Sequence, residues 1–318
     1  MSQIKDKKIF FIVNPMAGGR RANSKWESFL PKLEASGLDF FWEYTSSSGS
    51  AGEQIRHAVL QNNAEVIIVF GGDGTLFEVV NGLILNDKLI REEIILGVCS
   101  AGSACDFTRF AYTGFNGDAL DMLERGQIKY IDVGRCSFMA KDKTKQIRYY
   151  LNSCDMGAGA DTCYAVNANN GLLKKLLRGK LAFLLSALKV LMSFKYTNTH
   201  ITCNEEKYSG EYIIAGVGNV MYAGSGMKLF PNAELCDGKL DILLVSKRSR
   251  LEILRIFTKV YSGEFIHEKD VSYLQAALVS IETDLPVLIE LDGELVGYTN
   301  AEVSVLPSLL PLLQIPLS

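Results

Sequence analysis

The sequence lacks the features that mark several large classes of protein. Its 318 residues carry a formal net charge of -3, so the basic excess typical of nucleic-acid binders is absent. Its seven cysteines form no Cys-x-x-Cys pair, which argues against a redox or zinc motif and favours reduced thiols in the cytoplasm. Nucleic acid is therefore not an expected partner, and a cytoplasmic location is expected.

Long uninterrupted apolar runs are absent as well. Residues 181–194 are strongly apolar, but Lys189 interrupts them, and the segment is shorter than the ~20 residues that a membrane-spanning helix needs. Residues 305–317 are apolar but broken by prolines. The chain starts with polar and charged residues, and no signal peptide is visible there. Neither apolar segment is predicted to cross a membrane.

Two widely used phosphate-binding motifs are missing. No Gly-Lys is followed by Ser or Thr, so there is no Walker A loop, and no segment fits the dinucleotide fingerprint Gly-x-Gly-x-x-Gly. The histidines His57, His200 and His267 lie outside every motif, and we predict no catalytic role for them. Any phosphate binding must use another arrangement.

The chain does contain an apolar run that ends in a glycine-rich turn. The residues Val66–Phe70 predict a buried parallel strand, and residues 76–85 have helical spacing. Between them lies Gly71-Gly72-Asp73-Gly74-Thr75. Glycines let the backbone take positive φ and let anionic oxygens approach amides, and a helix start adds partial positive charge. The turn therefore predicts a phosphate site in which Asp73 serves a magnesium-bound polyphosphate.

The first part of the chain alternates short apolar segments with longer helical ones, which predicts a parallel α/β domain. Ligands of open α/β sheets bind beyond the carboxyl ends of the strands, so the loops 14–19, 45–50 and 71–75 should converge on one crevice. A fourth loop, 100–106, follows the next strand. The predicted strands are 9–13, 40–44, 66–70 and 94–98, and the predicted helices are 24–36, 51–62, 75–85 and 117–125.

After residue 128 short alternating strands predict an antiparallel β-rich domain. We place the first domain at residues 1–130 and the second at 131–304, with a tail, 305–318, that could pack back on the first. Residues 172–194 form a helical stretch in which basic residues accompany leucines. That pattern fits either a helix at an anionic membrane surface or a helix that covers the β-domain. The predicted strands are 131–138, 147–152, 197–203, 212–217, 240–245, 277–281 and 287–291.

Further short motifs extend along the chain. They are Asn14-Pro15-x-Ala17-Gly18, the turn Gly71–Thr75 followed by Glu78 and Asn81-Gly82, Ser100-Ala101-Gly102-Ser103 with Asp106-Phe107, Pro231-x-Ala233-x-x-x-Asp237-Gly238-x-Leu240-Asp241, and Asp292-Gly293-Glu294. Together they resemble the diacylglycerol kinase catalytic-domain family, which includes small bacterial lipid kinases and the sphingosine and ceramide kinases. The resemblance covers nearly the whole chain and implies a nucleotide-binding α/β domain followed by a β-sandwich.

The resemblance implies that ATP is the phosphate donor and lies in a cleft between the two domains. Its phosphates would lie near the turn 71–75 and the loop 14–18, and two side chains would offer hydroxyl groups to it. The residues implied to bind ATP are Asn14, Pro15, Gly18, Thr45, Gly71, Gly72, Asp73, Gly74, Thr75, Glu78 and Ser103.

The resemblance also implies catalytic roles for Glu294 and Asp73. Glu294 would be the general base that takes a proton from a lipid hydroxyl during in-line attack on the γ-phosphorus. Asp73 would act through Mg²⁺ and water to align the phosphates, with Asp106 assisting from the neighbouring loop. Without the resemblance, Asp292-Gly293-Glu294 would be interpreted as an ordinary hairpin turn.

A second, structural Mg²⁺ site is implied around residues 231–241. The Asp237 carboxylate would bind the ion together with backbone oxygens of Glu234 and Lys239, a ligand set that suits hard cations. The alternative is an ordinary Asp-Gly turn that opens the next strand.

Three positions depart from the family's usual residues. Cys105 and Phe77 stand where the family usually has asparagine, and Ser103 stands where it has threonine. Serine keeps the hydroxyl group, whereas Cys105 and Phe77 remove amide hydrogen-bonding capacity beside the turn.

These expectations describe an ATP- and Mg²⁺-dependent lipid kinase acting at a membrane surface, with diacylglycerol, converted to phosphatidic acid, as the first candidate acceptor. The alternatives are a kinase for another lipid alcohol of the sphingoid or glycerolipid type, a NAD kinase-like enzyme, and a non-catalytic nucleotide- or lipid-binding protein. NAD kinases are disfavoured because their Thr-Gly-Ser-Thr-Ala-Tyr type segment is missing. A homodimer and peripheral contact with the inner membrane surface stay open.

Overall fold

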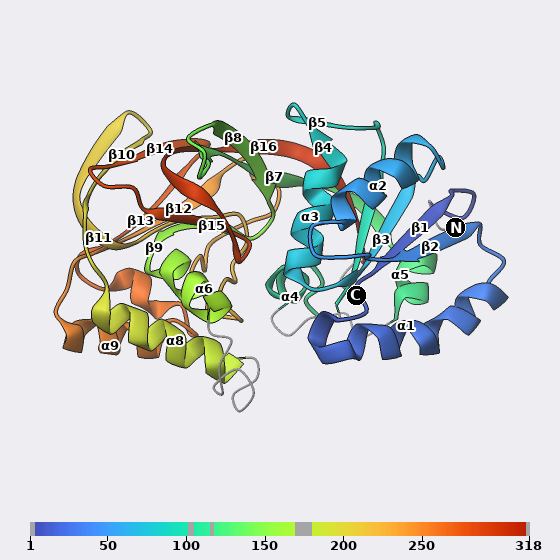
Figure 1. The fold of residues 1–318 in the computed structure, drawn as a ribbon, viewed down its shortest axis with the longest axis horizontal. Helices are drawn as coiled ribbons and strands as arrows, with labels where there is room; N and C mark the ends of the chain where they lie inside the picture. Colours follow the sequence, from blue (N-terminus) through green and yellow to red (C-terminus); the bar gives the residue numbers. More distant parts are fainter. Residues whose placement is uncertain (1–3, 101–104, 115–117, 169–179, 316–318) are drawn as a thin grey trace. The chain divides into compact units, whose positions relative to one another are not determined.

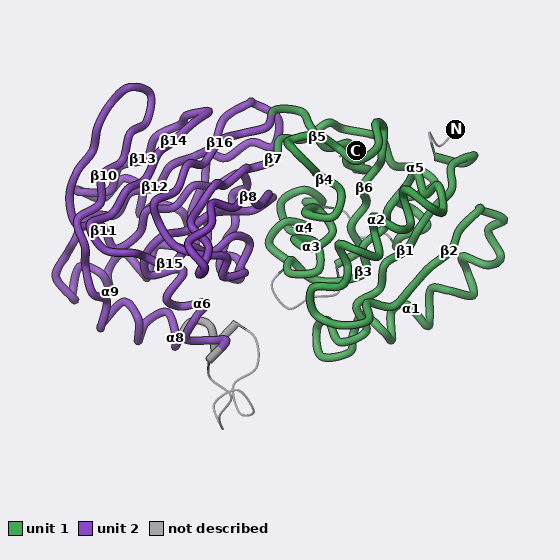
Figure 2. Tube along the Cα trace, turned by 45° about the horizontal axis from the view of Figure 1, so that its top comes forward, with its two compact units in different colours: residues 1–133, 307–318 green, residues 134–306 purple. Residues whose placement is uncertain are grey.

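The computed structural model describes residues 4–100, 105–114, 118–168 and 180–315. The chain divides into two compact units (Figure 2), one of residues 1–133 and 307–318 and the other of residues 134–306. Each unit has its own hydrophobic core. The two units are therefore described separately.

The first unit contains a parallel sheet in the order β16-β6-β3-β1-β2. Its strands are β1 (Ile9–Val13), β2 (Phe40–Tyr44), β3 (Val66–Gly71), β6 (Ile95–Ser100) and the last part of β16 (Glu294–Gln314). In the register, Val13 lies opposite both Tyr44 and Phe70, so β1, β2 and β3 end at the same level. Every residue of β1 and β3 is buried, which explains their unbroken apolar sequences.

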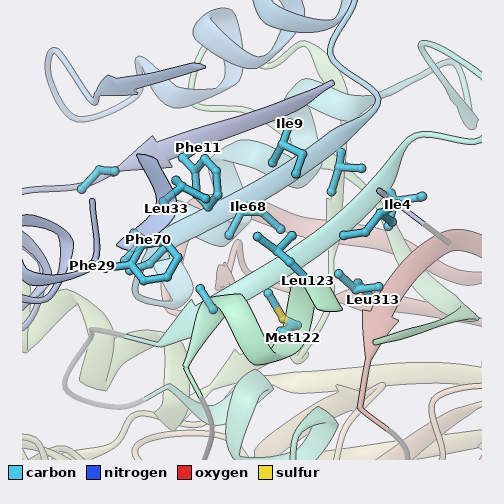
Figure 3. Close-up of a cluster of buried hydrophobic side chains, with 14 of the residues drawn as sticks. Ile4, Ile9, Phe11, Phe29, Leu33, Ile68, Phe70, Met122, Leu123 and Leu313 are labelled. Atoms are coloured by element: carbon cyan, nitrogen blue, oxygen red, sulfur yellow. The ribbon is translucent and has the colours of Figure 1, made fainter. Parts of the chain in front are cut away.

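The main core of this unit lies between the sheet and α1 (Ala17–Ala35) with α5 (Ala119–Arg125) (Figure 3). Phe29 from α1 and Met122 from α5 join Phe11 and Phe70 of the sheet there, and Leu313 of β16 belongs to the same cluster. The remaining elements are α2 (Ala51–Leu60), α3 (Asp73–Leu83), α4 (Asp106–Ala111) and the small hairpin of β4 (Ile84–Leu85) and β5 (Lys88–Leu89).

The second unit is built of antiparallel strands (Figure 1). They are β7 (Gln127–Met139), β8 (Lys145–Tyr150), β9 (Ser153–Gly157), β10 (Asn198–Cys203), β11 (Glu206–Gly218), β12 (Leu240–Ser246), β13 (Val271–Ala276), β14 (Leu278–Thr283), β15 (Leu288–Leu291) and the first part of β16. β11 pairs with β10 along its first half and with β12 and β9 along its second. β15 lies between β9 and β16.

Helices cover one core of this unit. They are α6 (Ala158–Ala168), α8 (Lys180–Ser193) and α9 (Arg250–Lys259), with a 3₁₀ turn at Glu264–His267. Ile253 and Ile256 of α9 are buried in this core, and Val190 and Leu191 of α8 pack against it. Of the predicted helix 172–194, residues 172–179 lie outside the described residues. Among the helices of the described ranges, none is both long and apolar enough to span a bilayer.

The predicted order of an α/β part followed by a β-rich part is confirmed, and some elements were missed. α9 was missed although Ser249 and Glu252 form a capping box at its start, which is a signal readable from the sequence. β9 and β13 were missed as well. β9 is buried along its whole length, so it shows no alternation between polar and apolar residues.

The crossing of α2 and α3 supplies a stability test, because Gly52 and Gly82 meet there. A Cβ added to Gly82 would lie 2.7 Å from the Gly52 carbonyl oxygen, a backbone atom that cannot move aside cheaply. We expect Gly82→Ala to lower the thermal unfolding midpoint, because overpacking costs about 1–3 kcal/mol and exceeds the gain in helix propensity. Gly210→Ala is the control, since its added Cβ meets nothing nearer than 3.7 Å. Equal midpoints for both variants, measured by circular dichroism, would contradict the close crossing.

Candidate functional site

The glycine-rich turn joins the end of β3 to the start of α3. Gly72 is the N-cap of α3 in an extended conformation, with φ -112° and ψ -174°. A Cβ on Gly71 would lie 2.7 Å from the Thr75 Cβ, so the turn closes too tightly for any side chain at position 71. The first amides of α3 lack intrahelical partners by construction and point toward the start of the helix. The turn therefore presents backbone donors at the carboxyl edge of the sheet.

Asn14 ties the loop after β1 to this turn. Its Nδ2 donates to the Thr75 Oγ1 at 2.9 Å, and its backbone nitrogen donates to the Phe70 carbonyl at 2.9 Å. Its Oδ1 accepts from the Met16 nitrogen at 3.0 Å. Beyond Pro15, Gly18 takes φ 61°, a left-handed conformation that suits glycine. The first and third loops of the sheet are thus joined through one amide side chain.

Asp73 ties the same turn to the loop after β6. Its Oδ2 accepts from the Asp106 nitrogen at 3.1 Å, and its Oδ1 accepts from the Phe107 nitrogen at 3.3 Å, at the start of α4. Asp106 itself is buried and pairs with Arg109 at 3.1 Å. The Asp73 carboxylate thus lies at the start of α3, beside the glycine-rich turn. Carboxylate oxygens are ligands that suit Mg²⁺, held directly or through water.

Glu78 organises the loop after β2. Its Oε1 accepts from the Gly49 nitrogen at 2.7 Å and its Oε2 accepts from the Ala51 nitrogen at 3.0 Å, at the start of α2. Thr45, the first residue of that loop, donates its backbone nitrogen to the Val13 carbonyl at 2.9 Å. The geometry gives Glu78 a supporting role for the loop that carries Thr45.

The three residues that depart from the family pattern lie in different structural environments. Cys105 is the N-cap of α4 with φ 53°, a left-handed conformation in which asparagine is enriched and cysteine is not. Phe77 is buried, so position 77 of this chain contributes to packing. Ser103 lies outside the described residues.

A pocket of about 720 Å³ borders the ends of β3 and β6 within the first unit. Lys25, Lys32 and Arg109 line it together with one acid, Asp118. The Lys25 Nζ donates to the Ser100 carbonyl at 3.0 Å, and Lys32 pairs with Asp118 at 3.1 Å. Because Arg109 pairs with Asp106 and Lys32 with Asp118, Lys25 supplies the net positive charge among these side chains, which favours an anionic ligand nearby.

In the second unit, Glu294 follows a two-residue hairpin turn between β15 and β16. Asp292 and Gly293 take φ 52° and 89°, as such turns require, and Glu294 is exposed. The Asp292 carboxylate accepts three backbone hydrogens, from Leu151 at 2.9 Å, Asn152 at 2.7 Å and Ser153 at 3.1 Å. The turn is thereby fixed to the connection between β8 and β9. The sequence did not reveal this role for Asp292, because an Asp-Gly hairpin already accounts for both residues.

Two acids are buried close to the same turn. Asp155 of β9 lies opposite Glu290 of β15, and both are at most 7% exposed. Asp155 accepts a hydrogen bond from the Ala160 nitrogen at 3.1 Å. Burial raises the pKa of Asp155 to about 7 and raises the pKa of Glu290 well above its usual value, which the nearby Asp155 raises further. Sequence analysis missed this pair, since only the strand register brings the two residues together.

The segment that contains Asp237 forms a tight turn. The Asp237 Oδ1 accepts from the Lys239 nitrogen at 3.0 Å. Burial, together with the neighbouring charges of Asp237 and Glu234, raises the pKa of Asp241 to about 6. Within the described ranges, no group of three or more His, Cys, Asp or Glu side chains is arranged to hold a metal ion. A cation at this turn would therefore depend on backbone oxygens.

Comparison with known protein families identifies the family of this chain. Residues 8–136 match the model of the diacylglycerol kinase catalytic domain, and residues 154–314 match the model of the YegS C-terminal NAD kinase beta sandwich-like domain. The chain belongs to the diacylglycerol kinase catalytic-domain family. The second match also confirms the prediction of a β-sandwich in the second part of the chain.

Relatives within the diacylglycerol kinase family match along nearly their whole length. A diacylglycerol kinase of Bacillus subtilis (strain 168) is 28% identical over 300 residues, which cover 93% of this chain and 92% of the relative. A diacylglycerol kinase of Staphylococcus carnosus (strain TM300) is 27% identical over 296 residues, which cover 93% of this chain and 91% of the relative.

Solved structures show the same architecture. A Bacillus anthracis protein described as a diacylglycerol kinase superimposes with a TM-score of 0.75 at 25% identity, covering 98% of this chain and 96% of that one. Yeast NADH kinase superimposes with a TM-score of 0.55 at 10% identity, covering 99% of this chain and 85% of that one. The second likeness shows a shared fold alone.

The buried acid Asp155 generates a pH-dependent prediction. Its pKa is about 7 in the folded chain and 3.8 in its ordinary state, so the folded state holds this proton more tightly. The free energy of unfolding that protonated Asp155 contributes is complete below pH ~4 and is lost as the pH rises through ~7. Asp155→Asn keeps an acceptor for the Ala160 amide and removes the charge.

We therefore expect Asp155→Asn to unfold about 4 °C higher than the unsubstituted protein at pH 8, with the gap narrowing as the pH falls toward 5. Thermal scans at several pH values measure the gap. A gap that does not change with pH would contradict a raised pKa at this position.

Proposed function

We propose that this protein is an ATP-dependent lipid kinase that transfers the γ-phosphate of ATP to a lipid hydroxyl, with diacylglycerol as the first acceptor to test. The observation that carries the proposal is the set of hydrogen bonds that Asn14 donates and that Asp73 and Glu78 accept. They join the loops after β1, β2, β3 and β6 at the carboxyl edge of the sheet of a diacylglycerol kinase-family domain. The product from diacylglycerol would be phosphatidic acid.

The nucleotide would bind along these joined loops. Backbone amides at the start of α3 and the left-handed glycine of the first loop would approach the phosphates, and the helix start favours negative charge. Hydroxyl groups of Thr45 and Ser103 would complete the contacts. Glu78 would act by fixing the loop after β2. The proposed set is Asn14, Pro15, Gly18, Thr45, Gly71, Gly72, Asp73, Gly74, Thr75, Glu78 and Ser103.

Magnesium would join the nucleotide at Asp73, because its carboxylate lies at the start of α3 beside the glycine-rich turn and carboxylate oxygens suit Mg²⁺. When bound, the ion would neutralise phosphate charge during transfer. A second Mg²⁺ is proposed at the Asp237 carboxylate with backbone oxygens of Glu234 and Lys239. That ion would stabilise the turn before β12 and take no part in the chemistry.

Glu294 would be the general base. It is exposed at the end of a turn whose conformation Asp292 fixes through three backbone hydrogens. An alcohol is a weak nucleophile, so a carboxylate that accepts its proton lowers the barrier to attack on phosphorus. Because the turn is already fixed, no ordering of the Glu294 backbone is needed during the reaction, and the position of the carboxylate stays constant.

The test is phosphate transfer from γ-labelled ATP to a panel of lipids in mixed micelles with Mg²⁺. We expect labelled product from one lipid class, with diacylglycerol giving labelled phosphatidic acid. Glu294→Gln should lower kcat by about 10²- to 10⁴-fold, as loss of a general base does. Asp73→Asn should lower it by about 10²-fold or more through loss of charge stabilisation.

Glu282→Gln is the matched control, because Glu282 is an exposed glutamate on β14 of the same unit. It should keep full activity. Transfer that survives in Glu294→Gln would exclude Glu294 as the base, and no transfer to any lipid from the unsubstituted protein would refute the kinase.

A further inference from the structure

Glu290 makes a direct contact with the turn that carries Glu294. Its Oε2 accepts a hydrogen bond from the Gly293 nitrogen at 2.6 Å, across the two-residue loop between β15 and β16. The residue is 7% exposed, so water competes weakly for this bond. Gly293 immediately precedes Glu294, so this hydrogen bond holds the Asp292–Gly293 peptide one residue before the Glu294 backbone leaves the turn.

The surroundings of Glu290 are acidic on every side. Asp155 lies opposite it in the β9–β15 register, where side chains are about 5 Å apart at Cβ. Burial and the charge of Asp155 raise the pKa of Glu290, the hydrogen bond from Gly293 lowers it, and the charges of the flanking Asp292 and Glu294 raise it further. Asp161 of α6 acts on Asp155 in the same way, and the Cys163 thiol of α6 lies near both buried acids.

None of the ion pairs formed by the described residues includes Glu290 or Asp155. A buried charge without a cation is costly, and two adjacent buried carboxylates cannot both ionise cheaply. A protonated carboxyl group at Glu290 avoids that cost. Its carbonyl oxygen still accepts the Gly293 hydrogen, and its hydroxyl can donate to Asp155.

We infer that Glu290 is a positioning residue for the proposed base: as a neutral carboxyl group it holds the Gly293 amide and thereby fixes the direction of Glu294. The inference rests on the proposed function, because Glu294 is the base in that proposal. Asp292 anchors the same turn to residues 151–153, while Glu290 anchors it through the Gly293 amide. A neutral Glu290 also leaves the negative charge of the turn to Asp292 and Glu294.

Two substitutions separate positioning from charge. Glu290→Gln keeps the size, the neutral state and a carbonyl acceptor for the Gly293 amide. Glu290→Leu keeps a similar volume and removes the acceptor. We expect Glu290→Gln to retain kcat within about threefold of the unsubstituted protein. Glu290→Leu should lower kcat at least about tenfold with an unchanged KM for ATP, because a catalytic group that is displaced from its productive position reacts more slowly.

A second readout does not depend on activity. Hydrogen–deuterium exchange of the segment 290–296 should be faster in Glu290→Leu and unchanged in Glu290→Gln. If Glu290→Leu fails to fold, the retained rate and exchange of Glu290→Gln still test the neutral state.

Three outcomes would overturn the inference. The first is an equal loss of kcat in both variants, which would mean that the charge of Glu290 is needed. The second is a Glu290→Leu variant with the kcat and the exchange rates of the unsubstituted protein. The third is a Glu290→Leu variant whose KM for ATP rises while its kcat is unchanged. Failure of the proposed function looks different, because the unsubstituted protein would then phosphorylate no lipid while the exchange readout remained informative.

Discussion

The hydrogen bonds that Asp73 accepts from Asp106 and Phe107 are the constraint on which the rest of the first unit depends. A parallel sheet brings the carboxyl ends of its strands to one edge, but it does not by itself fix the loops that leave that edge. Asp73 binds the loop after β3 to the start of α4. Asn14 and Glu78 then connect the loops after β1 and β2 to the same turn. Asn14, Asp73 and Glu78 thus hold the four loops together.

Both units use acidic side chains to hold backbone amides in their loops. Asp73 and Glu78 do so in the first unit, and Asp292 and Glu290 do so in the second. Hydrogen bonds to charged or buried acceptors are stronger than average, so loops held in this way keep their geometry. Glu294 differs from these four, because it is exposed and follows a turn that others fix. That difference agrees with the proposed role of Glu294 as the general base.

Much of this arrangement could be predicted from the sequence. The bounds of β1 and β2 are as predicted, because short apolar runs between polar loops leave little choice. The glycine-rich turn was also found, because its three glycines stand close together in the sequence; at Gly71 the structure leaves no room for a Cβ, which would lie 2.7 Å from the Thr75 Cβ. The Asp155–Glu290 pair and the Gly52–Gly82 crossing could not be found in this way. They arise when segments far apart in the chain are brought together, and no local pattern of residues records the register or the crossing point.

The most direct test of the account is hydrogen–deuterium exchange of the full chain with and without a non-hydrolysable ATP analogue and Mg²⁺. The account predicts slower exchange in residues 14–20, 45–51 and 71–78, whose amides would contact the phosphates or support those contacts. Residues 198–211, which form the β10–β11 hairpin, should be unchanged. Protection confined to other segments, or none at saturating analogue, would contradict a nucleotide site on the joined loops.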